Sequence, residues 1–262
     1  MDDSPRSSSN VPSPWVLLLV ALLFRPILAA GAVAAIAITP LVLMEVVMPI
    51  SRAALTMLPD ADELTGAVAY RTVILLVACA VCLIATMAAA AMAESVCGMR
   101  EGEPWSPRLL RRSALIWLVV LAAPYLYGLP WRLVVWTEAV TCCKTPIGSM
   151  VLSIQLLCWV TLKAGLASAL LVGLPDAVEG ERRRRTFAQG RDLFAICLLL
   201  FVALTIPQAA IDFAYWNTLE DNWKLVSSLA VIGDAVAALL ATFMAFAVRW
   251  RLEAETSPEI FE

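Results

Sequence analysis

The segment Val73–Ala93 reads VILLVACAVCLIATMAAAAMA and contains no charged residue. A helix of about 20 apolar residues is long enough to cross the roughly 30 Å hydrocarbon core of a bilayer. Apolar runs of similar length recur along the chain and are separated by short polar stretches. Because the backbone must satisfy its own hydrogen bonds in lipid, such runs form helices. This pattern predicts an all-α protein, a polytopic transmembrane helical bundle.

The composition favours lipid as the surroundings of the chain. Of the 262 residues, 61% are hydrophobic and 16% are charged, whereas soluble domains carry about 25% charged residues. The net charge of −3 argues against nucleic acid as a partner. We therefore expect the lipid bilayer to be the main partner of this protein.

Six spans can be placed on the apolar runs. Arg25-Pro26 interrupts the first run, because proline suits the first turn of a helix and arginine can reach the headgroups. We therefore expect 15–24 to form an extra interfacial or re-entrant helix. The alternative is one long tilted helix with a kink at Pro26. The predicted spans are 26–49, 70–95, 108–129, 149–173, 192–216 and 225–249.

The basic residues predict the orientation of these spans. With a cytoplasmic N-terminus, twelve Lys and Arg residues fall on the cytoplasmic side and five on the opposite side, which is the excess that cytoplasmic loops show. Most tryptophans also fall at predicted span edges, where they concentrate in membrane proteins. We expect a multi-pass protein of a bacterial inner membrane with both termini cytoplasmic.

Three regions follow from this map. The leader 1–14 is polar and rich in Ser and Pro, and we expect it to be disordered and cytoplasmic. It lacks the basic region and cleavage site of a secretory signal peptide. Residues 15–250 are predicted to form the six-helix membrane domain, and 251–262 a cytoplasmic tail.

Arginines gather in two predicted cytoplasmic hairpins. In the first, Ser106-Pro107 fits the start of a helix, and the arginines that follow share one helix face. The second hairpin has the same order of an acidic residue, a glycine and arginines, so the two resemble a parallel repeat. The arginines set the topology, or they bind anionic lipid headgroups. These candidate headgroup contacts are Arg108, Arg111, Arg112, Arg182, Arg183, Arg184 and Arg185.

Small residues are spaced for helix packing in two spans. Gly165, Ala169 and Gly173 repeat every four residues, and 85–93 is rich in alanine. Small residues on one face allow helices to approach closely. We expect both stretches to pack against neighbouring helices; a substrate path lined by small residues is the alternative.

Short motifs at these hairpins carry a resemblance to a known family. They are Arg25-Pro26, Gly102-Glu103-Pro104-Trp105-Ser106, Val178-Glu179-Gly180 and Arg185-Thr186. In them the chain resembles bacterial six-span proteins related to the membrane domain of glycerophosphodiester phosphodiesterases. The catalytic domain has no counterpart in these residues, so the resemblance implies a fold and a membrane role but no reaction.

Most of the residues that enzymes use are absent. The chain has no histidine, which excludes Ser-His-Asp triads, His-dependent metalloprotease motifs and haem ligation by histidine. Gly-rich phosphate loops are absent as well. Cys79 and Cys82 form a C-x-x-C within an apolar run, which is typical of buried thiols rather than of a metal or redox site. Cys142-Cys143 cannot easily bond to each other. We expect no enzyme activity, cofactor or metal.

Two charged residues within spans form the candidate site. A charge at bilayer depth costs about 2.5–3.5 kcal/mol on insertion scales, so it is usually paired or functional. Lys163 and Asp234 differ in predicted depth by about 6 Å at 1.5 Å per residue, which a lysine side chain can bridge. We predict that they pair or share a polar cavity, with Gln155 and Gln208 as neighbours. The pair either fixes helix packing or serves transport.

Three functions remain open. The leading hypothesis is a non-enzymatic membrane scaffold or lipid-organising protein, as the resemblance implies. A transporter of small solutes or lipids that uses Lys163 and Asp234 is the second, and an intramembrane enzyme is the third. The missing histidines disfavour the enzyme.

Overall fold

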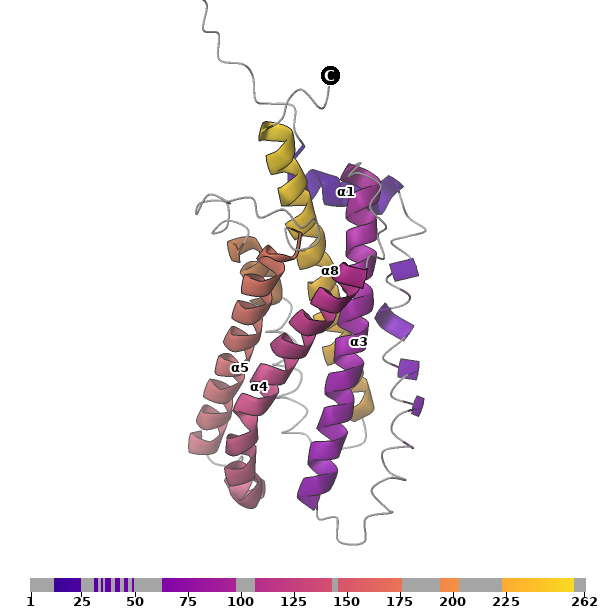
Figure 1. Ribbon diagram of the computed structural model, residues 1–262. Coiled ribbons are helices and arrows are strands. Elements are labelled where there is room, and N and C mark those ends of the chain that lie inside the picture. Colours follow the sequence, from indigo (N-terminus) through magenta and orange to yellow (C-terminus); the bar gives the residue numbers. More distant parts are fainter. Residues whose placement is uncertain are drawn as a thin grey trace, which may run out of the picture.

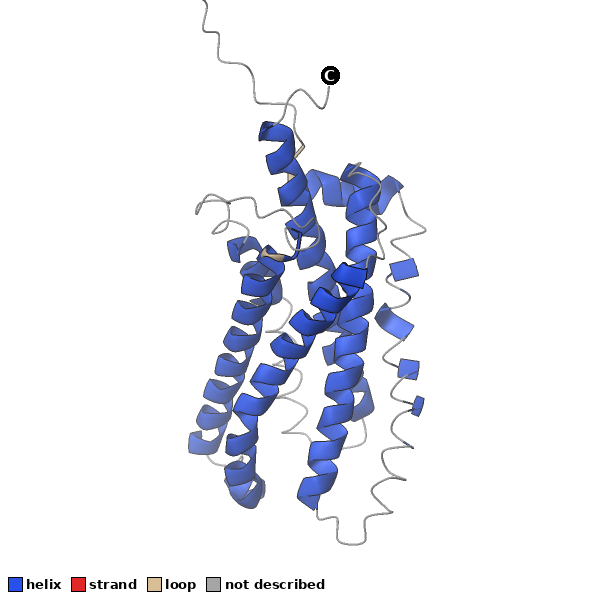
Figure 2. Cartoon of the chain, in the orientation of Figure 1, coloured by secondary structure: helices blue, strands red, loops and turns tan. Residues whose placement is uncertain are grey.

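The computed structural model describes residues 12–24, 31–32, 34, 36–38, 41–42, 45–46, 49, 63–97, 107–142, 146–175, 194–202 and 223–256. In these residues all regular secondary structure is helical, as Figure 2 shows. The prediction of an all-α fold is therefore confirmed for the part of the chain that the structure describes.

The described residues include five helices with defined ends, of which α3, α4 and α5 alternate in direction. In Figure 1, α3 runs toward the end of the bundle at which the C-terminus lies, α4 runs away from it, and α5 and α8 run back. The helices are α1 (Pro14–Phe24), α3 (Glu63–Cys97), α4 (Pro107–Cys142), α5 (Pro146–Val172) and α8 (Trp223–Thr256).

Proline marks the starts of three helices. Pro14, Pro107 and Pro146 each occupy the first position of a helix, where the missing N–H would have no partner and the fixed φ already suits the helix. Before α1, the hydroxyl of Ser13 accepts a hydrogen bond from the Val16 N–H at 3.3 Å. This is the N-cap arrangement. The start of α4 at Pro107 agrees with the helix start that Ser106-Pro107 predicts in the first hairpin.

The predicted spans lie within longer helices. Spans 70–95, 108–129 and 225–249 fall inside α3, α4 and α8, and 149–173 agrees closely with α5. The helices continue past the edges of the predicted spans. The end of a helix depends on capping and turn residues, whereas the edge of a span depends on where the apolar run stops. The segment 194–202 is helical. The remainder of predicted span 192–216, and much of 26–49, lie outside the described residues.

Two helices are apolar and long enough to cross a membrane. They are Thr72–Val96, with 25 residues, and Val231–Trp250, with 20 residues. Val160–Val172 in α5 and Pro14–Leu23 in α1 are shorter apolar helical stretches. The described residues thus show two helices of membrane-spanning length, and the crossing of the bilayer by six spans stays a prediction.

The first apolar run contains a separate helix. α1 ends at Phe24, just before Arg25-Pro26, and Figure 1 shows it lying across the bundle near the end at which α3 finishes. It packs against α8 and α3. A helix is therefore present where the sequence predicts one at 15–24, and Arg25-Pro26 lies outside the described residues.

The core lies around α8. This helix packs extensively on α3 and also contacts α1 and α5, and from 231 to 250 every residue is buried or half-buried. On α3, Ala85, Ala89 and Ala93 have no exposed surface. Alanines spaced by four residues lie on one helix face and allow close approach. The packing predicted for 85–93 is confirmed.

The packing predicted for Gly165, Ala169 and Gly173 is wrong. Ala169 and Gly173 are exposed, and a Cβ added to Gly165 would meet no atom within 4 Å. The buried face of α5 instead carries Lys163 and its apolar neighbours. Residues 163 and 165 are about 200° apart on a helix with 3.6 residues per turn, so burying Lys163 turns the half-buried Gly165 away from the core face of α5.

Candidate functional site

Lys163 lies on the inner face of α5. Its residue surface is 1% exposed, and it is flanked by Val160, Ala164 and Ala167, which are also buried. These positions follow the i, i+3, i+4 and i+7 spacing of one helix face. The apolar side chains therefore direct the only described charged residue of α5 toward the bundle interior.

Asp234 meets this lysine from α8. Lys163 Nζ donates a hydrogen bond to Asp234 Oδ1, and the two groups form an ion pair although 71 residues separate them in sequence. The aspartate side chain is 10% exposed. The pairing that we expected from the predicted depths of the two residues is present in the structure.

A thiol from a third helix lies close to the pair. Cys82 of α3 is fully buried and near enough to interact electrostatically with both charged groups. The thiol of α3 is therefore within electrostatic range of the charged pair that α5 and α8 form. Gln155 is part of α5 but its side chain, like all of Gln208, lies outside the described residues.

The ion pair joins α5 to α8, while α3 and α4 also pack on each other. α3 packs mainly against α8, and α5 mainly against α4, whereas α5 and α8 meet at few positions. Leaving one buried charge without its partner is costly, about 3–5 kcal/mol in soluble proteins. The pair therefore contributes strongly to the stability of the α5–α8 contact, because the apolar contact between these helices is small.

A second polar contact crosses the core at Trp117. Its Nε1–H donates a hydrogen bond to Thr86 Oγ1 at 2.8 Å, joining α4 to α3. The Trp117 ring also lies 6.0 Å from the Phe201 ring, centroid to centroid. Sequence reasoning placed Trp117 inside a span without a partner. This contact could have been predicted, because a buried indole N–H needs an acceptor. Thr86 is a polar residue of the preceding predicted span.

The segment 194–202 connects α4 with α8. Phe201 contacts Trp117 of α4, and the Cys197 thiol donates to the Ala241 carbonyl of α8 at 3.9 Å. Both residues are fully buried. The segment thus lies between the two helix pairs and completes the interior on the side of Trp117.

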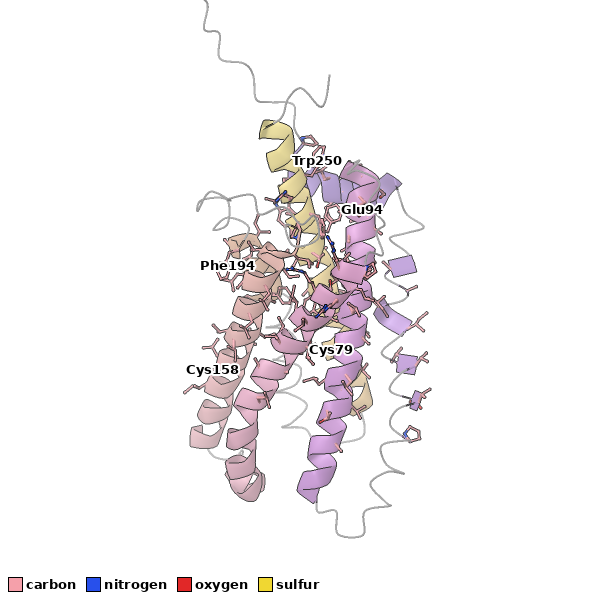
Figure 3. The ribbon with its side chains drawn as sticks, viewed as in Figure 1. Cys79, Glu94, Cys158, Phe194 and Trp250 are labelled. Carbon is pink, nitrogen blue, oxygen red and sulfur yellow. The ribbon has the colours of Figure 1, made fainter. Side chains whose placement is uncertain are left out.

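The cysteines are free thiols where the structure describes them. Cys82 and Cys197 are buried, and Cys79 is half-buried. Cys158 projects from the outer side of α5, away from the bundle (Figure 3). Among the described residues no group of three His, Cys, Asp or Glu side chains could hold a metal ion. Cys142 ends α4, and Cys143 lies outside the described residues.

The arginines of the first hairpin are exposed. Arg108, Arg111 and Arg112 all lie in the first two turns of α4 with exposed side chains. Figure 3 shows Glu94 and Trp250 near the end of the bundle at which the C-terminus lies. Arg182, Arg183, Arg184 and Arg185 lie outside the described residues, so the structure does not bring the two arginine groups together.

Comparison with known proteins adds no relative. No family model, curated protein or solved structure matches this chain.

Proposed function

We propose that the chain is an integral membrane protein that crosses a bacterial inner membrane six times, with both termini on the cytoplasmic side. Two observations support the proposal. Helices α3 and α8 each contain an apolar stretch long enough for a bilayer, and the consecutive helices α3, α4 and α5 alternate in direction (Figure 1). The predicted excess of basic residues on the side of the termini gives the orientation.

Within the membrane we propose a non-enzymatic scaffold or lipid-organising role, as in the six-span proteins that the chain resembles. The observation that carries this proposal is that Lys163 and Asp234 neutralise each other in the bundle interior. A charged pair that is enclosed and mutually satisfied supports helix packing. The exposed Arg108, Arg111 and Arg112 supply positive charge for anionic headgroups.

Fusions of two reporters test the topology. A fluorescent reporter that matures in the cytoplasm should be active after Gly102, Gly180 and Glu262. A phosphatase that is active only outside the inner membrane should be active after Asp60, Cys143 and Asn217. Activity of the phosphatase after Gly180 or Glu262 would contradict the six-span map.

Transport is the second candidate, and one observation favours it. The ion pair joins α5 to α8, two helices that share few other contacts. Ionisable residues within a bilayer often mark ion or proton pathways.

Proteoliposomes separate the two functions. With a pH-sensitive dye inside and an imposed pH gradient, the scaffold predicts that wild type and Lys163→Met/Asp234→Leu both lose the gradient at the rate of protein-free vesicles. Proton-coupled transport predicts a faster loss with wild type that disappears in the double variant. Circular dichroism of both proteins shows that the variant keeps its helices.

A further inference from the structure

α1 is apolar on every side. Its sequence PWVLLLVALLF contains no charged side chain and no polar side chain other than the indole N–H of Trp15. A helix that is hydrophobic all round belongs inside a protein core or in lipid. The two sides of α1 therefore need two apolar environments.

The protein supplies only one of them. Leu17, Leu18 and Ala21 are buried in the core where α1 packs on α8 and α3. The other side is exposed and carries large apolar residues, Trp15 at 51%, Leu19 at 57% and Leu23 at 64%. These three are spaced by four residues and lie on one face. Val16 and Leu22, also exposed, widen that face.

The described residues of α1 are too few to cross the bilayer. Its 11 residues extend over about 16 Å, roughly half of the hydrocarbon thickness. α1 also lies across the bundle and not along it (Figure 1). A short apolar helix in this direction can occupy one leaflet only.

We propose that the exposed face of α1, formed by Trp15, Val16, Leu19, Leu22 and Leu23, is embedded among the acyl chains of the single leaflet on the side of the termini. The inference rests on the proposed membrane function. α1 lies near the end of the bundle at which the C-terminus lies (Figure 1), which is the side of the termini in the proposed topology.

The occupant is lipid and not protein because the face offers no polar group for specificity. Interfaces between proteins carry a polar rim around their apolar centre, and the described side chains of α1 provide none. Trp15 lies in the first turn of the helix, and tryptophan is the residue that membrane interfaces favour.

Photocrosslinking of the full chain in anionic vesicles tests the proposal. A compact diazirine amino acid replaces Leu19 or Leu23 on the exposed face, and Leu17 on the buried face serves as the matched control. Ile84 is the reference for the bilayer centre, since it is 39% exposed and is the middle residue of Thr72–Val96. The vesicles contain phosphatidylglycerol and phosphatidylethanolamine. A nitroxide quencher that intercepts the carbene formed from the diazirine is attached to the lipid either near the headgroup or at the end of the acyl chain.

The expected result is lipid adducts at Leu19 and Leu23, with the shallow quencher acting more strongly than the deep one. Leu17 should give crosslinks within the chain, and Ile84 lipid adducts affected mainly by the deep quencher. Adducts of twice the chain mass at Leu19 and Leu23 would show that the exposed face contacts a second copy of the chain, and would overturn the inference. Adducts with water alone, or equal effects of both quenchers, would also overturn the inference.

The reference position separates this inference from the proposed function. If lipid adducts form at Ile84 but not at Leu19 and Leu23, the proposed membrane function is retained and the embedding of α1 in lipid is contradicted. Absence of lipid adducts at Ile84 contradicts the membrane function itself. A thermal unfolding curve in detergent for each variant verifies that the inserted amino acid leaves the fold intact.

Discussion

Lys163 Nζ donates its hydrogen bond to Asp234 Oδ1 across the α5–α8 contact, with Cys82 of α3 beside the pair. Both charged residues are buried. One electrostatic contact thus connects two helices that share few apolar contacts.

Removal of one charge should destabilise the protein more than removal of both. Lys163→Met or Asp234→Asn leaves a buried group without its partner, at about 3–5 kcal/mol. Lys163→Met/Asp234→Leu should cost much less than the sum of the single changes, because paired residues are not additive. Unfolding of the purified variants by a denaturing detergent measures the free energies, and additive losses would contradict a stabilising pair.

Loss of the Thr86 hydroxyl should cost about 1–3 kcal/mol, because Thr86→Val leaves the buried Trp117 N–H without its acceptor. Trp117→Phe/Thr86→Val removes both partners, so the coupling between the two changes should be measurable. Thr161→Val is the control, since Thr161 is exposed and its hydroxyl bonds only to the Leu157 carbonyl of the same helix. Equal losses for Thr86→Val and Thr161→Val would contradict a role for the contact.

Substitution on the outer face of α5 should be harmless or stabilising. A Cβ at Gly165 meets open space, and Ala is favoured over Gly in a helix interior by about 0.5–1 kcal/mol. Gly165→Ala should therefore raise the unfolding midpoint. Ala167→Leu, on the fully buried face, should instead destabilise by about 1–3 kcal/mol through overpacking. The reverse order of the two effects would show that Gly165 packs closely against another helix.

Loss of the exposed arginines should weaken the binding of anionic lipid. Each basic residue near an anionic membrane surface contributes about 1 kcal/mol, so replacing Arg108, Arg111 and Arg112 with Gln should reduce retained phosphatidylglycerol and the effect of salt on it. Native mass spectrometry after delipidation counts the retained lipids. Leu115→Ala, at an exposed apolar position of the same helix, is the control, and an unchanged lipid count in the triple variant would exclude these headgroup contacts.

The ion pair shows how far local reasoning reaches. Lys163 and Asp234 could be matched from the sequence because the rise per residue gives each a depth within its span, and a buried charge needs a partner. The contact of Trp117 with Thr86 was missed, although both residues lie within predicted spans, because depth alone does not tell which helices are neighbours. The packing face of α5 was wrongly assigned to Gly165, Ala169 and Gly173.

Two features can be read from the sequence alone. They are the apolar run within each predicted span and the need of Lys163 for a counter-ion. They determine helices, because backbone hydrogen bonds in a helix are made locally, and they determine which charges must be buried together. The neighbours of each helix depend on contacts between residues far apart in sequence, such as Cys197 with Ala241. Only the tertiary structure therefore decided that α8 lies at the centre, that Gly165 faces outward, and that α1 lies across the bundle.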